Sequence, residues 1–298
     1  MKKSRIRRTV AVVLVAVTIL ILCGFYFPVF NGRNGGEFLH GIGEYAGGHL
    51  LDYVYYEPSG RGSYPLVIWL HGLGHGSFPG DQLNNNEIEN WATREYQSRF
   101  EGAGGAYILC PRSPEDNDVT WWSLGMTDAL MALIEEFIQE HPNVDTNRIY
   151  IGGFSLGGYM ALEMCKTYPD FFAAAFPACP AVQPGNPDLS SLADMPVWIT
   201  TSTLDRTVPY RMVSDYWDNL MEVSNVAADC RISLLGQARD DDGRKLSSNH
   251  YSWYAVTSDM FTSSDQEYFS LKTYDGYGDE IELEFPDGMI AWLSSHSK

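Results

Sequence analysis

Two kinds of apolar pattern alternate along the chain beyond residue 40. Short, nearly continuous apolar runs are typical of buried strands, and longer stretches with apolar residues at every third or fourth position are typical of helices. The predicted strands cover residues 50–56, 65–70, 106–110, 148–152, 172–176, 197–201 and 232–235. The predicted helices cover residues 123–141, 159–168, 208–223 and 286–294.

This alternation of strands and helices predicts the fold class. Strand–helix–strand units build a mostly parallel sheet with helices on both faces. We therefore expect one α/β domain over residues 40–298, with its functional residues at the carboxyl ends of the strands. Residues 255–285 break the alternation, and two short runs on either side of Asp275 and Gly276 predict a β-hairpin-like insertion there.

The first 30 residues differ from the rest of the chain. Five basic residues lie among the first eight, and the 22 residues of 9–30 carry no charge. At about 1.5 Å per helical residue this stretch reaches roughly 33 Å, enough to cross a bilayer. We expect a transmembrane signal anchor over 1–30 and a linker over 31–39, with the domain on the extracellular side of the cell membrane. A cleaved signal peptide, and hence a secreted domain, is the alternative.

Charge and cysteine usage exclude several classes of function. The formal net charge is −18, which disfavours binding to nucleic acid or to an anionic membrane surface. We therefore expect membrane contact through the N-terminal helix only. The five cysteines show no spacing typical of a metal site. We predict no metal, no cofactor and no particular disulfide, and the oligomeric state stays open.

One motif carries most of the chemical information in the chain. Ser155 lies between Gly153 and Gly157, after a predicted strand and before a predicted helix. A serine between glycines at a sharp strand-to-helix turn is called a nucleophile elbow, and its hydroxyl stands exposed above the helix N-terminus. There the amide dipoles favour developing negative charge. The motif predicts that Ser155 is a nucleophile, and the alternative is a glycine-rich turn with a bystander serine.

A serine nucleophile needs two partners. A histidine takes the serine proton, and a carboxylate orients the histidine, in the chain order Ser, Asp or Glu, His for folds built around an elbow. His250 lies in a polar loop after the strand 232–235, and Asp205 lies just beyond the strand 197–201. We predict His250 as the base and Asp205 as the acid. An ordinary loop histidine and a helix-capping aspartate are the alternatives.

Two further features concern substrate binding. The oxyanion of a tetrahedral intermediate needs amide donors that are already in place. We expect the backbone N–H of Leu156 and one from the glycine-rich loop after strand 65–70, with Leu73 the first choice and Gly72 the second. Trp121 and Trp122 form either a stacking platform for a sugar or aromatic acid or the packing of a loop over the sheet, and both interpretations stay open.

The segments 44–58, 64–72 and 153–158 together resemble the α/β-hydrolase superfamily. Within it, the chain is similar to secreted esterases of the polyhydroxybutyrate-depolymerase and feruloyl-esterase type and to prolyl-oligopeptidase-like catalytic domains. The resemblance covers roughly residues 40–255 and the final helix, and it implies the same nucleophile, acid and base: Ser155, Asp205 and His250. The β-propeller that restricts true oligopeptidases to short peptides has no counterpart in these residues, which puts peptidase activity in doubt.

These observations lead to one expected function with two alternatives. We expect a serine hydrolase of the carboxylesterase type that acts through an acyl-enzyme on an extracellular ester, either a small molecule or a polysaccharide-linked or aromatic-acid ester. A serine peptidase of the prolyl-oligopeptidase-like class is the first alternative. A non-enzymatic surface binding domain on a hydrolase scaffold is the second.

Overall fold

A computed structural model describes residues 38–298 except 46–47, 75–87, 114–119, 122, 124, 186, 241 and 263–269. The expected signal anchor, most of the expected linker and Trp122 lie outside the described residues. Among those that are described, we find no helix with the length and apolar character needed to span a membrane.

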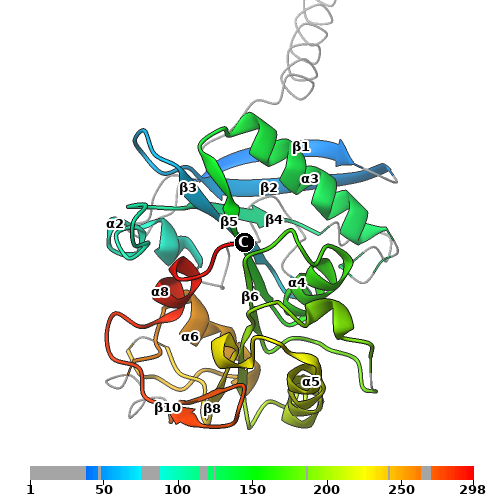
Figure 1. The fold of residues 1–298 in the computed structure, drawn as a ribbon, viewed down its shortest axis with the longest axis vertical. Helices are drawn as coiled ribbons and strands as arrows, with labels where there is room; N and C mark the ends of the chain where they lie inside the picture. Colours follow the sequence, from blue (N-terminus) through cyan, green and yellow to red (C-terminus); the bar gives the residue numbers. More distant parts are fainter. Residues whose placement is uncertain are drawn as a thin grey trace, which may run out of the picture.

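The described strands form one sheet with the order β1-β2-β4-β3-β5-β6-β7-β8-β9-β10 (Figure 1). The six strands from β4 to β8 in this order pair in parallel, and the pairs at both ends of the sheet are antiparallel. The strand bounds are β1 Leu39–Tyr45, β2 His49–Tyr56, β3 Tyr64–Leu70, β4 Tyr107–Pro111, β5 Val144–Phe154, β6 Ala174–Ala178, β7 Trp198–Ser202, β8 Arg231–Leu235, β9 Lys272–Asp275 and β10 Glu280–Ile281. The mostly parallel sheet confirms the predicted fold class.

Helices cover both faces of this sheet. The α-helices are α2 Arg94–Gln97, α3 Met126–Glu140, α4 Leu156–Thr167, α5 Tyr210–Val223, α6 Trp253–Thr257 and α8 Met289–Ser294. The buried residues of α3, α4 and α5 belong to one hydrophobic cluster, and those of α6 and α8 belong to a second cluster. Side chains of a strand alternate between the two faces of a sheet, so the central strands contribute to both clusters and are buried almost throughout.

Three of the four predicted helices begin later in the structure than the sequence pattern suggested, and the helix predicted from residue 159 begins earlier, at Leu156. The helix expected from residue 123 starts at Met126, after Gly125 with its φ of +81°. The closing helix starts at Met289 rather than at 286, and α5 starts at Tyr210 because Pro209 precedes it in an extended conformation. Apolar periodicity continues through a turn, whereas backbone hydrogen bonding does not, so helix starts are the least certain part of such a prediction.

The structure differs from the sequence prediction at the two edges of the sheet. β1 was not predicted, because Gly41 is its one buried residue and it contains two glycines. The region expected as a hairpin-like insertion contains β9 and β10, which pair antiparallel to each other. β9 also pairs with β8 and therefore extends the central sheet, and Thr273 of β9 is fully buried.

Candidate active site

Ser155 occupies the turn between β5 and α4. Its φ of +53° and ψ of −117° lie where residues other than glycine are rarely found. Three backbone hydrogen bonds hold it there: its N–H donates to the carbonyl of Ala178 at the end of β6 (3.0 Å), and its carbonyl accepts from Tyr159 (3.0 Å) and Ala181 (2.9 Å). The strained turn is thus fixed by segments on both sides of it, and Ser155 is only partly buried.

The glycines of the motif allow β3 to approach the turn. A Cβ on Gly157 would overlap the carbonyl oxygens of Leu70 and His71, and a Cβ on Gly153 would lie 2.5 Å from the Leu70 oxygen. Any side chain at either position would therefore push the end of β3 away. This close packing brings the loop after β3, where an oxyanion donor was expected, directly against the Ser155 turn.

Asp205 and His250 meet although 45 positions separate them in the chain. Asp205 lies in the loop after β7, and His250 lies in the 3-10 helix η6, Asn249–Ser252. The His250 Nδ1 is 2.7 Å from the Asp205 Oδ2, and both residues are buried. The carboxylate's other oxygen accepts from the N–H groups of Thr207 (2.8 Å) and Val208 (3.1 Å). Asp205 therefore both shapes its own turn and binds the histidine.

The thiol of Cys179, which sequence reasoning did not single out, lies between the Ser155 turn and the His250 segment. Cys179 follows Ala178, the residue that holds the Ser155 N–H, and its Sγ donates to the carbonyl of His250 at 3.1 Å. On the other side, the Ser248 hydroxyl accepts from the His250 N–H at 3.1 Å. The end of β6 therefore joins the serine turn to the histidine segment, and all three predicted residues lie at the carboxyl edge of the sheet.

The pKa of His250 reflects opposing effects. Burial lowers this pKa, but Cys179 and the Asp205 carboxylate outweigh burial and raise it above the usual histidine range. The Asp205 carboxylate, 2.7 Å from the His250 Nδ1, thus stabilises the protonated imidazole.

The expected oxyanion donors lie on either side of the turn. Leu156 is the first residue of α4, next to Ser155. In the loop after β3, the His71 Nε2 accepts from the N–H of Ser113 at 3.0 Å, so the His71 Nδ1 carries a proton and donates to the Gly72 carbonyl at 2.7 Å. The N–H of a trans peptide points opposite to its carbonyl. His71 thus holds the Gly72–Leu73 peptide with the Leu73 N–H directed away from the imidazole.

Trp121 packs under this same loop. Only 2% of its surface is exposed, and its Nε1 donates to the His71 carbonyl at 3.0 Å. A ring buried to this degree offers no free face to a substrate. Of the two interpretations that the sequence left open, the position of Trp121 matches loop packing rather than a stacking platform.

Cys179, Asp205 and His250 also form a cluster of the kind that binds metals. Their ligand atoms lie within 4.8 Å of one another. Asp205 and His250 are already joined by a 2.7 Å hydrogen bond, and the other Asp205 oxygen accepts from two backbone N–H groups. The arrangement therefore fits an acid–base pair better than a metal centre.

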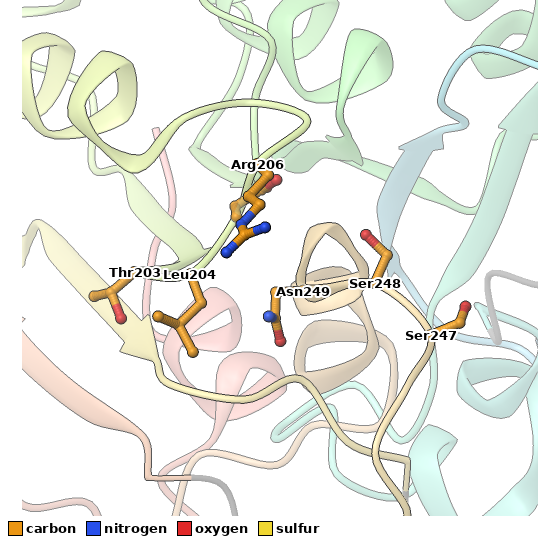
Figure 2. A pocket seen from close by; sticks show the side chains of 7 residues that line it. Thr203, Leu204, Arg206, Ser247, Ser248 and Asn249 are labelled. Atoms are coloured by element: carbon orange, nitrogen blue, oxygen red, sulfur yellow. The ribbon is translucent and has the colours of Figure 1, made fainter.

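A cavity of about 460 Å³ opens beside the acid, and sequence reasoning missed it (Figure 2). It is lined by Thr203, Leu204, Asp205, Arg206, Ser247, Ser248 and Asn249. The lining comes from two loops far apart in the chain, and no local pattern in either loop marks a cavity.

Comparison with known families agrees with this geometry. The sequence model of the prolyl oligopeptidase family matches residues 122–278, more than half of the chain. The chain belongs to the prolyl oligopeptidase family. The matched region of the chain includes Ser155, Asp205 and His250. Within the curated proteins, poly(3-hydroxyalkanoate) depolymerase C of Paucimonas lemoignei is 27% identical over 132 residues, which cover 40% of this chain and 29% of the depolymerase.

Solved structures share the fold. A thermostable esterase superposes with a TM-score of 0.60 and 24% identity, covering 94% of this chain and 64% of the esterase. An S-formylglutathione hydrolase from Agrobacterium tumefaciens gives a TM-score of 0.54 with 15% identity, covering 81% of this chain and 99% of that hydrolase. The expected superfamily is confirmed: the chain belongs to the α/β-hydrolase superfamily.

Proposed function

We propose that this protein is a serine hydrolase of the carboxylesterase type in which Ser155 is the nucleophile, His250 the general base and Asp205 the acid. The observation that carries the proposal is the 2.7 Å hydrogen bond between Asp205 and His250 at the same sheet edge as the strained Ser155 turn. A carboxylate bound to Nδ1 keeps the proton on that nitrogen and leaves Nε2 free to accept one from a serine hydroxyl.

The proposed reaction has two stages. In the first, the Ser155 Oγ attacks the ester carbonyl carbon while the His250 Nε2 takes the hydroxyl proton. The amides of Leu156 and Leu73 donate to the resulting oxyanion. Collapse of the tetrahedral intermediate breaks the bond to the alcohol, which leaves with the proton from His250. In the second stage, His250 activates a water molecule that hydrolyses the acyl-enzyme and restores the serine.

Two considerations favour an ester as substrate. The curated relative is, by its name, a depolymerase of a poly(3-hydroxyalkanoate), and its match covers 29% of that protein. The chain also shares its fold with an esterase over nearly its whole length. We propose an ester outside the cell, small or polysaccharide-linked, because the N-terminal 30 residues have the pattern of a signal anchor or signal peptide.

The family membership itself favours a second candidate, a serine peptidase. The matching family is named for prolyl oligopeptidases, and an acylaminoacyl peptidase shares the fold with a TM-score of 0.50 and 18% identity, covering 76% of this chain and 41% of that peptidase. The same three side chains serve amide hydrolysis, since His250 would protonate the leaving amine instead of an alcohol.

Covalent labelling and a substrate panel test both candidates. A fluorophosphonate probe should label the native protein, and Ser155→Ala should abolish labelling and lower kcat by about 10⁶-fold, the loss typical of removing such a serine. The melting temperature should change little, because alanine keeps the Cβ and the backbone geometry. The matched control is Ser190→Ala at an exposed position, which should keep both labelling and turnover.

The panel compares 4-nitrophenyl acetate and methyl ferulate with aminoacyl-4-nitroanilides. Faster turnover of the esters is expected, and faster turnover of the anilides would replace the esterase proposal by the peptidase. A folded protein that neither reacts with the probe nor turns over any substrate would contradict both and leave a binding domain on a hydrolase scaffold.

A further inference from the structure

The cavity beside Asp205 differs in chemistry from the rest of the site. Its described lining comes from the loop after β7 and from residues 247–249, which lead into the His250 segment. Among these lining residues Arg206 is the one cation and Asp205 is the one anion. Asp205 therefore lines the cavity itself, whereas His250 is next in the chain to the lining residue Asn249.

Both oxygens of the Asp205 carboxylate already accept hydrogen bonds. Its Oδ2 binds His250, and its Oδ1 binds the N–H groups of Thr207 and Val208. Arg206 makes no ion pair with a described carboxylate, and its side chain is exposed. In a chain with a net charge of −18, this arginine places a positive charge without a described acidic partner in the cavity next to Asp205, where an anionic ligand could bind it.

A second donor belongs to the same cavity. The Asn249 Oδ1 accepts from the Gln237 Nε2 (2.8 Å) and from the N–H of Ala238 (3.0 Å), and this fixes which end of the amide is the oxygen. The Asn249 NH₂ then has no partner among the described residues. Figure 2 shows the Arg206 guanidinium directed toward the side of the cavity that Asn249 occupies, while the Asn249 oxygen turns away from it.

Hydroxyl groups complete the lining. The Ser248 Oγ accepts from the N–H of His250, so its own hydrogen is available to donate into the cavity, and Ser247 lines the same side. Guanidinium, amide and hydroxyl groups can each donate a hydrogen bond to a carboxylate, and a guanidinium can bind both of its oxygens at once.

We propose that this cavity is a carboxylate-binding subsite, in which Arg206 and Asn249 hold an acid group carried by the ester substrate. The inference rests on the proposed esterase function and narrows it to esters that bear a carboxylate. The cavity of about 460 Å³ accommodates a short acid-bearing chain on either the acyl or the alcohol part of such an ester.

Matched pairs of substrates test this proposal. On the acyl side, the 4-nitrophenyl monoester of adipic acid is compared with neutral 4-nitrophenyl hexanoate. On the alcohol side, 4-(acetoxymethyl)benzoic acid is compared with benzyl acetate. For one of the two pairs, the ratio of kcat/KM for the charged ester to that for the neutral ester should fall by about fivefold in Arg206→Gln, the scale of an exposed ion pair. The pair that responds identifies which part of the substrate carries the acid.

Two further variants sharpen the result. Asn249→Asp keeps an oxygen for Gln237 and Ala238 but replaces the donating NH₂ by a negative oxygen, so the same ratio should fall further than in Arg206→Gln. Arg211→Gln removes an equal charge from α5 at a side chain that is 90% exposed and outside the cavity. It should leave the ratio unchanged, and added salt should reduce the wild-type preference for the charged ester.

The carboxylate subsite can still be tested if the esterase proposal fails. Should the native protein turn over neither pair, calorimetric titration with adipate measures binding without catalysis, and weaker binding in Arg206→Gln than in Arg211→Gln would support the subsite. Equal selectivity ratios in Arg206→Gln and the native protein for both pairs would overturn the proposal. For an inactive protein, adipate binding that does not depend on Arg206 would do the same.

Discussion

The candidate active site has two halves that are built in opposite ways. The serine half depends on side chains that are absent: Gly153 and Gly157 let the end of β3 lie against the turn, and backbone hydrogen bonds hold Ser155 in its strained conformation. The acid–base half depends on side chains that are present, because one hydrogen bond between Asp205 and His250 joins two loops.

This difference has consequences for what each half tolerates. Steric packing of backbone against backbone responds to any added atom, whatever its polarity. A hydrogen-bonded ion pair responds to charge and donor type, even when size is preserved. The serine half should therefore be sensitive to volume and the acid–base half to charge.

Among the changes that compare the two halves, the largest expected effect comes from removing charge at constant size. Asp205→Asn should lower kcat by about 10⁴-fold, since an amide no longer stabilises the imidazolium or holds the right tautomer. The free energy of unfolding should fall far less than this rate loss implies. Steady-state kinetics and urea unfolding measure the two quantities. The control is Asp215→Asn on α5, whose carboxylate is 58% exposed, and near-normal turnover of Asp205→Asn would assign the acid to another residue.

The next effect adds one methyl group to the serine half. Gly157→Ala should lower the free energy of unfolding by about 3 kcal/mol, at the upper end of overpacking, because the new Cβ meets backbone oxygens that cannot rotate aside. Gly102→Ala is the comparison, since Gly102 has a φ of +73° with open space around it. Strain alone should cost about 1 kcal/mol there. Equal losses in urea unfolding would show that packing against β3 does not hold the turn.

The smallest expected effect is on pH dependence. His250 acts as a base only when it is neutral, and its raised pKa keeps it protonated to a higher pH than a free imidazole. The acidic limb of kcat/KM should therefore lie above the usual histidine range. In Asp205→Asn the residual activity should show this limb at lower pH, because the carboxylate that raises the pKa is gone. A limb at the same pH in both proteins would mean that another group titrates.

Much of the fold was predictable because the central strands are buried on both faces. β3 is buried throughout and reads as a continuous apolar run, so burial leaves a direct signal in the sequence. β1 left no such signal, since it lies at the edge of the sheet and has a single buried residue. Strand ends moved by one or two residues, as in β6 and β7, because pairing with the neighbouring strand decides where a strand stops.

In the candidate site, too, only the residues with a local sequence signal were predictable from their surroundings in the chain. Ser155 was recognisable because a strand, two glycines and a helix surround it within a few residues. Asp205 and His250 were assigned from their order along the chain and from family resemblance, and the structure brings them together. Cys179 and the cavity with Arg206 and Asn249 gave no sequence signal, because each depends on loops that meet only after folding.

By itself, the sequence determined the alternation of strands and helices and the position of the serine turn, since both follow from local sterics and from the burial of neighbouring residues. The tertiary structure decided which loops meet at the carboxyl edge of the sheet. That meeting depends on strand order and register, which arise from contacts between residues far apart in the chain. The charge environment of His250 and the donors around the adjoining cavity follow from those contacts.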